Sequence, residues 1–499
     1  MSTSQQLPRL GADVHKPEQV YPEKVLQIGE GNFLRGFVDW MIHEANQKGL
    51  FKGSVVVAQP LGNGLAKFIN EQNGVYTLLM RGVENGKVVE RQQIIQSITR
   101  CLNPYAEWDQ FLATAKNPEL RFIVSNTTEA GIAYCADDKQ TDAPPSSFPA
   151  KLTLLLLERY KAFNGDVNKG FILLPCELID RNGDNLKKTI LQTANNWKLD
   201  AAFIEWVEKA NIFANTLVDR IVPGYPRNEV EALCQKAGYL DSVFDSSEAF
   251  HLWVIEAPAS VAKELPLPEA GLHVIFTDDM TPYRERKVRI LNGAHTATVL
   301  GAYLAGKNFV GECMDDEAIS GFMRKAIFEE VIPTLSLSKE ELAAFAEAVF
   351  ERFRNPFIEH ALLSISLNSV SKYKARVLPS LEKYVEINGK VPARLTLGLA
   401  SLIAFYRGTE IKDGALIGKR NGIEYQIKDN PEILQAFAEL WKGFDGSEAA
   451  VKKIADTVLG KSEWWGRDLR TIAGLTDAIV ADLLAIESKG AAAVIASVA

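Results

Sequence analysis

A glycine-rich turn lies between a short apolar run and a helical pattern near the start of the chain. Residues 24–28 predict a buried strand, and the helical pattern begins near Phe37. Gly29, Gly31 and Gly36 follow the spacing G-x-G-x-x-x-x-G, two residues longer than the usual dinucleotide fingerprint. Such glycines let the backbone turn sharply and approach a pyrophosphate, to which a helix N-terminus offers free N–H groups. A plain tight turn would use the same residues, but the strand-turn-helix context favours a Rossmann-type α/β domain.

Polar residues follow several predicted strands, where α/β sheets place ligand contacts. Strand 54–58 ends at Gln59, which has no neighbouring arginine to hold a 2′-phosphate, so NAD is favoured over NADP. Strand 121–125 ends in a Ser-Asn-Thr-Thr-Glu segment, which a capped turn would explain equally well. The candidate cofactor-binding residues are therefore Ile28, Gly29, Gly31, Asn32, Phe33, Gly36, Gln59, Ser125, Asn126 and Thr127.

Further α/β signals continue to about residue 280. Strand-like runs at 75–81 and 87–95 flank Asn85-Gly86, which predicts a hairpin. Strand 170–175 ends beside Glu177, and Asp219 and Arg220 interrupt a later apolar run. An Asp-Arg pair among valines and isoleucines is costly to bury unless matched, so a structural ion pair and a site role are both open. Helices are predicted at 103–115, 150–162, 185–197 and 201–210.

From Lys287 onward the pattern is helical and strand signals almost vanish. We therefore expect an α/β N-terminal Rossmann-type domain over residues 1–284 and an all-α C-terminal domain over residues 285–499. A substrate cleft would form where the two domains meet. Helices are predicted at 287–304, 316–331, 338–353, 356–366, 394–406, 431–441, 447–459 and 472–489.

The first helix after this boundary carries the strongest catalytic candidates. At about 100° per residue, Lys287, Asn292 and His295 share an arc of roughly 140°, with Arg289 on the opposite face. A base, an amide and an imidazole on one face could move a proton and stabilise an oxyanion. Taken alone, residues 287–296 are more simply interpreted as an ordinary amphipathic helix in which the histidine is hydrogen-bonded within the core.

The bulk properties exclude several other classes of protein. A chain of 499 residues is too long for one core, and its net charge of −8 without a basic block disfavours nucleic acid and anionic membranes. The start is polar and no stretch of about 20 apolar residues occurs, so we expect neither a signal peptide nor a membrane span. Five cysteines without a CxxC pair suit the cytoplasm and argue against a structural zinc site, so no metal is expected.

With these motifs assembled, the chain resembles the long-chain polyol dehydrogenase family, which includes mannitol dehydrogenase and the hexuronate reductases. The resemblance covers about residues 21–485. It is carried by Ile28-Gly-Glu-Gly-Asn-Phe-Leu-Arg-Gly, Ser125-Asn-Thr-Thr-Glu-Ala-Gly, Pro175-Cys-Glu-Leu-Ile, Thr216-Leu-Val-Asp-Arg and Lys287-Val-Arg-Ile-Leu-Asn-Gly-Ala-His-Thr. Three segments resemble the hexuronate reductases more closely. They are the motifs that begin at Ser125 and Pro175 and the segment Arg354-Asn-Pro-Phe-Ile-Glu-His.

The resemblance implies metal-independent hydride transfer with NAD. The family's catalytic lysine, asparagine and histidine fall on Lys287, Asn292 and His295, and its substrate-site aspartate falls on Asp219. Mannitol dehydrogenases carry an asparagine where this chain has Leu178, which favours a different substrate. That substrate would be a hexuronate or its aldonate, bound also by Glu177.

A hexuronate carboxylate needs a cation. Lys372 is the candidate, with Lys374 and Arg376 beside it, although such a run is as often a solvated face. A fructuronate reductase, a mannitol-type polyol dehydrogenase and a catalytically silent dinucleotide-binding regulator are the alternatives. The intact Lys-Asn-His trio argues against the regulator, and the oligomeric state is open.

Overall fold

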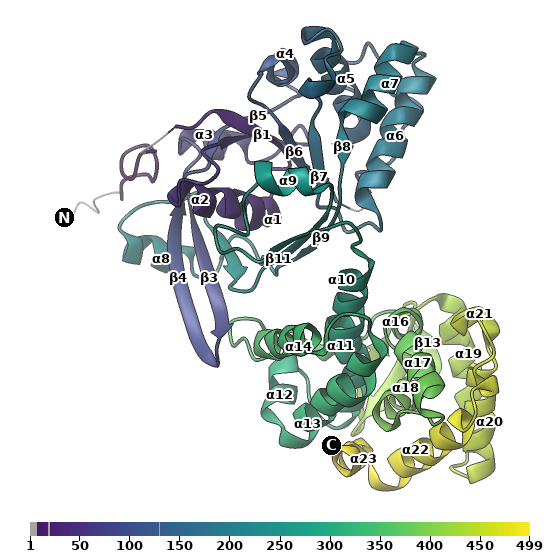
Figure 1. The fold of residues 1–499 in the computed structure, drawn as a ribbon. Coiled ribbons are helices and arrows are strands. Elements are labelled where there is room, and N and C mark those ends of the chain that lie inside the picture. Colours follow the sequence, from purple (N-terminus) through teal and green to yellow (C-terminus); the bar gives the residue numbers. More distant parts are fainter. Residues whose placement is uncertain (1–6, 18–19, 129) are drawn as a thin grey trace. The chain divides into compact units, whose positions relative to one another are not determined.

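The computed structural model describes residues 7–17, 20–128 and 130–499. The chain forms two compact units, coloured from purple to teal and from green to yellow in Figure 1. The first unit comprises Met1–Gly82 and Val88–Met280, and the second comprises Val83–Lys87 and Thr281–Ala499.

A parallel six-stranded sheet forms the centre of the first unit. Its strands lie in the order β5-β2-β1-β6-β7-β8, so the chain leaves β1 in one direction and returns to its other side with β6. This reversal beside the first strand is the Rossmann arrangement and confirms the predicted fold class. The strands are β1 (Glu23–Ile28), β2 (Ser54–Ala58), β5 (Ile98–Leu102), β6 (Phe122–Ser125), β7 (Ile172–Pro175) and β8 (Ile212–Phe213).

Helices cover both faces of this sheet, which explains why its strands are continuous apolar runs. Val25 packs on one face with Phe37 and Met41 of the first helix. Leu26, the next residue along β1, packs on the other face with Leu155. The helices of this unit are α1 (Asn32–Leu34), the π-helical turn η1 (Arg35–Asp39), α2 (Trp40–Gln47), α3 (Ala66–Glu71), α4 (Trp108–Ala113), α5 (Phe148–Ala162), α6 (Asn182–Asn196), α7 (Ala201–Ala210), α8 (Val230–Ala237) and α9 (Ala259–Glu264).

Two small sheets accompany the large one. The predicted hairpin is confirmed, with Asn85 and Gly86 both at positive φ in its turn. Strand β10 adds to this hairpin in parallel, giving the order β10-β3-β4, and the other sheet has the order β12-β11-β9. The strands are β3 (Tyr76–Glu84), β4 (Lys87–Ile95), β9 (Asn215–Asp219), β10 (Asp245–Glu248), β11 (Leu252–Glu256) and β12 (Val274–Thr277).

The second unit is mainly helical. Helices α11 and α18 are buried along most of their lengths and pack so closely that a Cβ on Gly398 would lie 2.8 Å from the carbonyl oxygen of Ala297. The helices are α10 (Thr281–Arg286), the π-helical turn η4 (Lys287–Asn292), α11 (Gly293–Leu304), α12 (Val310–Asp315), α13 (Glu317–Lys325), the π-helical turn η5 (Ala326–Val331), α14 (Lys339–Phe353), α15 (Leu362–Ile365), α16 (Ser369–Arg376), α17 (Leu378–Asn388), α18 (Ala393–Phe405), α19 (Pro431–Trp441), α20 (Glu448–Leu459), α21 (Ser462–Trp465), α22 (Leu475–Lys489) and α23 (Ala491–Val498). Within the described ranges, none of the helices is long and apolar enough to cross a membrane.

The expectation of a purely helical second domain is wrong at one place. Strands β13 (Gly408–Lys412), β14 (Ala415–Arg420) and β15 (Ile423–Ile427) form an antiparallel sheet. Asp413-Gly414 and Asn421-Gly422 occupy its two turns, all four residues with positive φ. These dipeptides are the standard signal for two-residue hairpins, and the sequence interpretation overlooked them.

Two predicted helices are shorter than expected because side chains stabilise turns. The helix predicted at 356–366 is ordered as α15 only from Leu362, since the Asn355 side chain accepts a hydrogen bond from the Phe357 N–H (3.0 Å). The helix predicted from Asn103 begins at Trp108, because the Asn103 side chain accepts from the Tyr105 N–H (3.0 Å). Such local bonds compete with helix formation.

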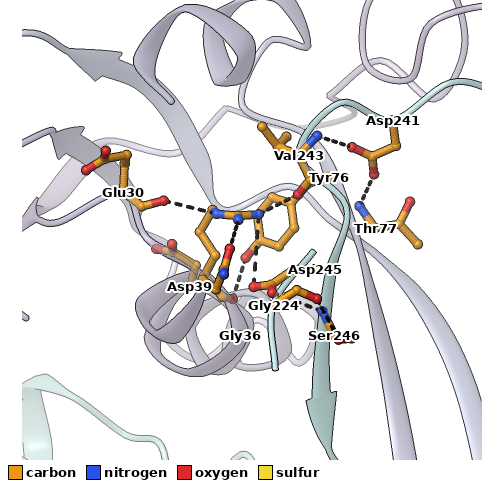
Figure 2. A network of polar contacts seen from close by, with 12 residues as sticks. Glu30, Gly36, Asp39, Tyr76, Thr77, Gly224, Asp241, Val243, Asp245 and Ser246 are labelled. Atoms are coloured by element: carbon orange, nitrogen blue, oxygen red, sulfur yellow. Dashed lines mark hydrogen bonds and ion pairs between the residues drawn. The ribbon is translucent and has the colours of Figure 1, made fainter. Parts of the chain in front are cut away.

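A fully buried arginine, Arg35, connects the glycine-rich turn to the sheet of β10, β3 and β4. Figure 2 shows the network to which it belongs, with Glu30, Tyr76 and Val243 labelled. The Arg35 guanidinium donates to the carbonyl oxygens of Glu30 (3.1 Å) and Val243 (2.5 Å) and to the side chain of Asn32 (2.8 Å). The Tyr76 hydroxyl in turn donates to the carbonyl oxygen of Arg35 (2.6 Å). These contacts hold the turn, the first helix and strand β3 in one arrangement.

Two carboxyl groups lie buried in the same network. Burial raises the pKa of Asp39 to about 7, although the Gln27 amide donates to it at 3.0 Å and Arg35 opposes the shift. Burial likewise raises the pKa of Asp245 to about 7, with Arg35 4.0 Å away. One oxygen of each carboxyl group has no hydrogen-bond partner among the described residues. The folded unit therefore favours the protonated acids.

We predict that Asp39→Asn removes a pH dependence of stability. Because the pKa of Asp39 lies near 7 in the folded protein and its ordinary value is 3.8, the wild-type protein loses stability as the pH rises between these values. The neutral amide has no such loss, so the Tm of the variant minus that of the wild type should rise by roughly 5 °C from pH 4.5 to pH 7.5. Thermal unfolding followed by circular dichroism measures it. A difference independent of pH would contradict the assignment.

Candidate functional site

The predicted cofactor residues of the first unit meet at one edge of its large sheet. Ile28 pairs with Ala58 of β2 on one side and with Ser125 of β6 on the other. Ser125 pairs with Pro175 of β7. The carboxyl ends of all four strands therefore lie together, at the point where the strand order reverses, which is where such sheets bind their ligands.

The glycine-rich turn is open on one side and closed on the other. Gly29 has φ +126°, and a Cβ there would lie 3.1 Å from the carbonyl oxygen of Asn126. Gly31 precedes the first helix, and a Cβ there would meet nothing within 4 Å. An open backbone before a helix of sixteen residues (32–47), including its π-helical turn, offers N–H groups to an anion. This cradle fits the pyrophosphate of a dinucleotide.

Three other residues of the turn have structural contacts. The Asn32 side chain accepts from Arg35, and Phe33 stacks on Phe37 with ring centroids 5.0 Å apart. A Cβ on Gly36 would lie 3.0 Å from a methyl group of Val222. Gly36 therefore permits close packing inside the protein, whereas Gly31 leaves room at the surface of the turn.

Gln59 organises the loop that follows β2. Its amide nitrogen donates to the carbonyl oxygens of Leu61 (2.8 Å) and Gly62 (3.1 Å), and its oxygen accepts from the N–H of Ala66 (3.1 Å) at the start of α3. Both donor hydrogens are thus used within the loop. A ribose hydroxyl could therefore bind Gln59 only by donating a hydrogen bond to the remaining lone pair of its side-chain oxygen.

Glu177 ties together the loops that follow β6 and β7. Its carboxyl group accepts from the Ser125 hydroxyl (3.0 Å) and from both the N–H and the hydroxyl of Thr127 (2.9 Å each). Burial raises the pKa of Glu177 against these hydrogen bonds. The Asn126 amide donates to the carbonyl oxygen of Cys176 (2.9 Å). Glu129, the last residue of this motif, lies outside the described residues.

The remaining predicted substrate residues of the first unit differ in exposure. Asp219 ends β9 and is buried, opposite Leu252 of β11. The adjacent Arg220 donates to the carbonyl oxygens of Glu248 (3.0 Å) and Gly36 (2.7 Å). Leu178 occupies the position at which mannitol dehydrogenases are expected to carry an asparagine. Its apolar side chain is 66% exposed to solvent.

The second unit positions Lys287, Asn292 and His295 on a helix with a π-helical turn. The helix begins at Thr281, so the expectation that it starts near Lys287 is wrong. Lys287 and Asn292 open and close the π-helical turn η4, whose i→i+5 hydrogen bonding places residues five apart on one face. His295 follows Asn292 at the i+3 spacing that puts neighbours on one face of an α-helix.

The surroundings of these three residues differ. Lys287 and Asn292 are half-buried, and the Asn292 amide has no hydrogen-bond partner within the described part of the chain. His295 is buried. The centroid of its ring lies 4.1 Å from that of the Phe353 ring and 5.3 Å from that of the His360 ring. Arg289 turns toward α17, where its guanidinium donates to the Ser380 hydroxyl (3.2 Å).

His295 is held neutral. Burial lowers its pKa well below the ordinary value, and positive charge on His360, Arg352, Arg376 and Lys372 adds to the shift. A neutral imidazole can donate one hydrogen bond to a developing oxyanion without changing its own charge. His360 ends the motif that begins at Arg354, and Arg352 lies two residues before that motif. No spacing signal in the sequence connects either residue to His295.

Helix α16 separates the three cations of the predicted basic run. Lys372 and Arg376 are half-buried, while Lys374 is exposed and lies against Gly466, where a Cβ would be 3.3 Å from its side chain. The Lys372 ammonium donates to the carbonyl oxygen of Ile365 (2.8 Å). Among the described residues, no group of three or more histidine, cysteine or acidic side chains could hold a metal ion.

Two family models together match most of the chain. The mannitol dehydrogenase Rossmann domain matches residues 23–269, and the mannitol dehydrogenase C-terminal domain matches residues 279–487. An altronate oxidoreductase from Escherichia coli O1:K1 is 47% identical over 475 residues, which cover 95% of this chain and 96% of that protein. An altronate oxidoreductase from Yersinia enterocolitica is 46% identical and covers 96% of this chain and 98% of its own.

Solved structures agree with this relationship at the level of the fold. A D-sorbitol dehydrogenase in substrate-free form superimposes with a TM-score of 0.79 at 21% identity, covering 96% of each chain. The Pseudomonas fluorescens mannitol 2-dehydrogenase, in a ternary complex with NAD and D-mannitol, gives a TM-score of 0.64 at 22% identity and covers 96% and 95% of the two chains. With both domain models matched in order and relatives this similar over nearly the whole length, the chain belongs to the mannitol dehydrogenase family.

Proposed function

We propose that this NAD-dependent oxidoreductase of CH–OH groups interconverts D-tagaturonate and D-altronate in hexuronate catabolism. Family membership and the printed names of relatives at 46–47% identity support a sugar-acid substrate. The observation that carries the proposal is the helix face of Lys287, Asn292 and His295, together with the positive charge of Arg376 and Lys372 that acts on His295.

The first unit binds the dinucleotide in this proposal. The open backbone at Gly31 and the helix after it take the pyrophosphate, while Ser125, Asn126 and Thr127 line the same edge of the sheet. Glu177 keeps that segment in place through its hydrogen bonds to Ser125 and Thr127. When bound, the dinucleotide would supply hydride as NADH for reduction or accept it as NAD⁺ for oxidation.

The second unit handles the proton and the negative charge. As hydride reaches the carbonyl carbon, the carbonyl oxygen becomes an alkoxide, and the Lys287 ammonium gives that oxygen a proton. The free amide of Asn292 and the neutral imidazole of His295 donate hydrogen bonds that stabilise the negative charge before the proton arrives. In the reverse direction the neutral lysine removes the hydroxyl proton. No step requires a metal.

A substrate panel tests this function directly. We expect the purified enzyme to oxidise NADH with D-tagaturonate at least tenfold more efficiently (kcat/KM) than with D-fructuronate or D-fructose, and to prefer NADH to NADPH. Dialysis against EDTA should leave the rate unchanged. A preference for D-fructose, or absorbance changes with none of these compounds, would overturn the proposal in favour of a mannitol-type enzyme or a different substrate.

Lys287→Ala should lower kcat by about 10²–10⁴-fold, which is the usual effect of removing a general acid or base. NADH affinity, measured by fluorescence titration, should remain near that of the wild type because the dinucleotide-binding residues lie in the first unit. Arg289→Ala is the matched control on the same helical turn, because its guanidinium contacts Ser380 instead. A folded Lys287→Ala variant with near wild-type turnover would exclude the lysine mechanism.

Gly31→Ala should weaken NADH binding by about tenfold or more without changing the Tm of the protein alone. The added methyl group meets no protein atom within 4 Å, but it occupies the space that we assign to the pyrophosphate. Gly36→Ala is the contrasting variant. Its methyl group would lie 3.0 Å from Val222, so overpacking should lower the Tm. Unchanged NADH affinity in Gly31→Ala would remove the turn from the cofactor site.

A further inference from the structure

Helix α16 directs two cations and one backbone carbonyl toward the helix of the catalytic candidates. Lys372 and Arg376 are four residues apart and therefore share one face of α16. The carbonyl oxygen of Arg376 would lie only 3.2 Å from a Cβ at Gly293, the residue that directly follows Asn292. Glycine at position 293 thus allows the end of α16 to approach the catalytic helix closely.

The charged groups around His295 are cationic, and two of them, Arg376 and Lys372, have no carboxylate partner among the described residues. Three cations, Arg352, Arg376 and Lys372, act on its imidazole together with His360, whose own pKa is lowered by burial. Among the described residues, neither Arg376 nor Lys372 forms an ion pair with a carboxylate within 4 Å. Asp429 acts on Lys372 from a distance, but its carboxylate accepts hydrogen bonds from the Tyr406 hydroxyl (2.5 Å) and the Val370 N–H (3.3 Å).

Arg376 differs from the other arginines that this protein encloses. Arg159 donates to four backbone carbonyl oxygens, and Arg286 pairs with Glu341 at 2.7 Å. The half-buried guanidinium of Arg376 has no hydrogen-bond partner in the described part of the chain. A charged group that has lost part of its hydration without gaining a partner is costly, unless a ligand supplies the missing contacts.

We propose that Arg376 binds the carboxylate of the substrate and so selects uronates over neutral ketoses. Its planar guanidinium can form two parallel hydrogen bonds to a carboxylate, which the Lys372 ammonium cannot do. Lys372 is already directed to the carbonyl oxygen of Ile365 and contributes charge beside it. This inference rests on the proposed function, because it assigns the acid group of that substrate to a residue of the same site.

The test compares two substrates that differ only at the terminal carbon. D-Tagaturonate carries a carboxylate where D-tagatose carries a hydroxymethyl group, and the reacting ketone is otherwise the same. We expect Arg376→Gln to lower kcat/KM for D-tagaturonate by about 10²–10³-fold, while kcat/KM for D-tagatose changes by less than about threefold. Lys374→Gln is the control, because this exposed lysine on the same helix lies against Gly466.

A misfolded variant would lower both activities, so two further measurements separate folding from recognition. Arg376→Ala assayed with added guanidinium should regain part of its activity toward D-tagaturonate and gain none toward D-tagatose. NADH affinity should match the wild type. Equal losses for the two substrates, or a wild-type ratio in folded Arg376→Gln, would overturn the role of Arg376. If the wild-type enzyme itself failed to reduce D-tagaturonate but reduced another substrate, the proposed function would fail instead.

Discussion

The hydrogen bonds of the buried Arg35 guanidinium are the interactions on which the shape of the glycine-rich turn in the first unit depends. The guanidinium joins carbonyl groups from the glycine-rich turn and from the segment before β10, which are more than two hundred residues apart in the chain. Because a buried charge must be matched, every partner of Arg35 constrains where the turn can lie. The turn can therefore remain open at Gly31 without losing its shape, since its fixed side is held from within the protein.

Local patterns predicted much of this protein correctly. The strand, the glycine-rich turn and the helix that follows are encoded within about twenty consecutive residues, and the parallel strands appear as apolar runs because helices cover both faces of the sheet. The sheet of β13–β15 was missed although its turns carry Asp-Gly and Asn-Gly, because the surrounding helical periodicity dominated the interpretation. The π-helical turn at Lys287 has no comparable local signal, since its extra residue per turn depends on packing.

The candidate site shows the same limit. Residue type and spacing predicted the trio of Lys287, Asn292 and His295, but they could not distinguish the three cations of α16. Helical geometry separates Lys374 from the other two, and the carbonyl oxygen of Ile365 then distinguishes Lys372 from Arg376. Gln59 shows the reverse case, since an amide expected to face a ligand is largely used by its own loop. Partners so distant in sequence become visible only in the folded chain.

The positive charge around His295 has a practical consequence for measurements on this enzyme. Phosphate, citrate and sulfate are small anions that a cationic site attracts, and they would compete there with a charged substrate. Buffer composition and ionic strength would then alter the apparent KM for an acid substrate more than that for a neutral one. Kinetic constants of this protein are therefore comparable between laboratories only when the buffer anion and its concentration are the same.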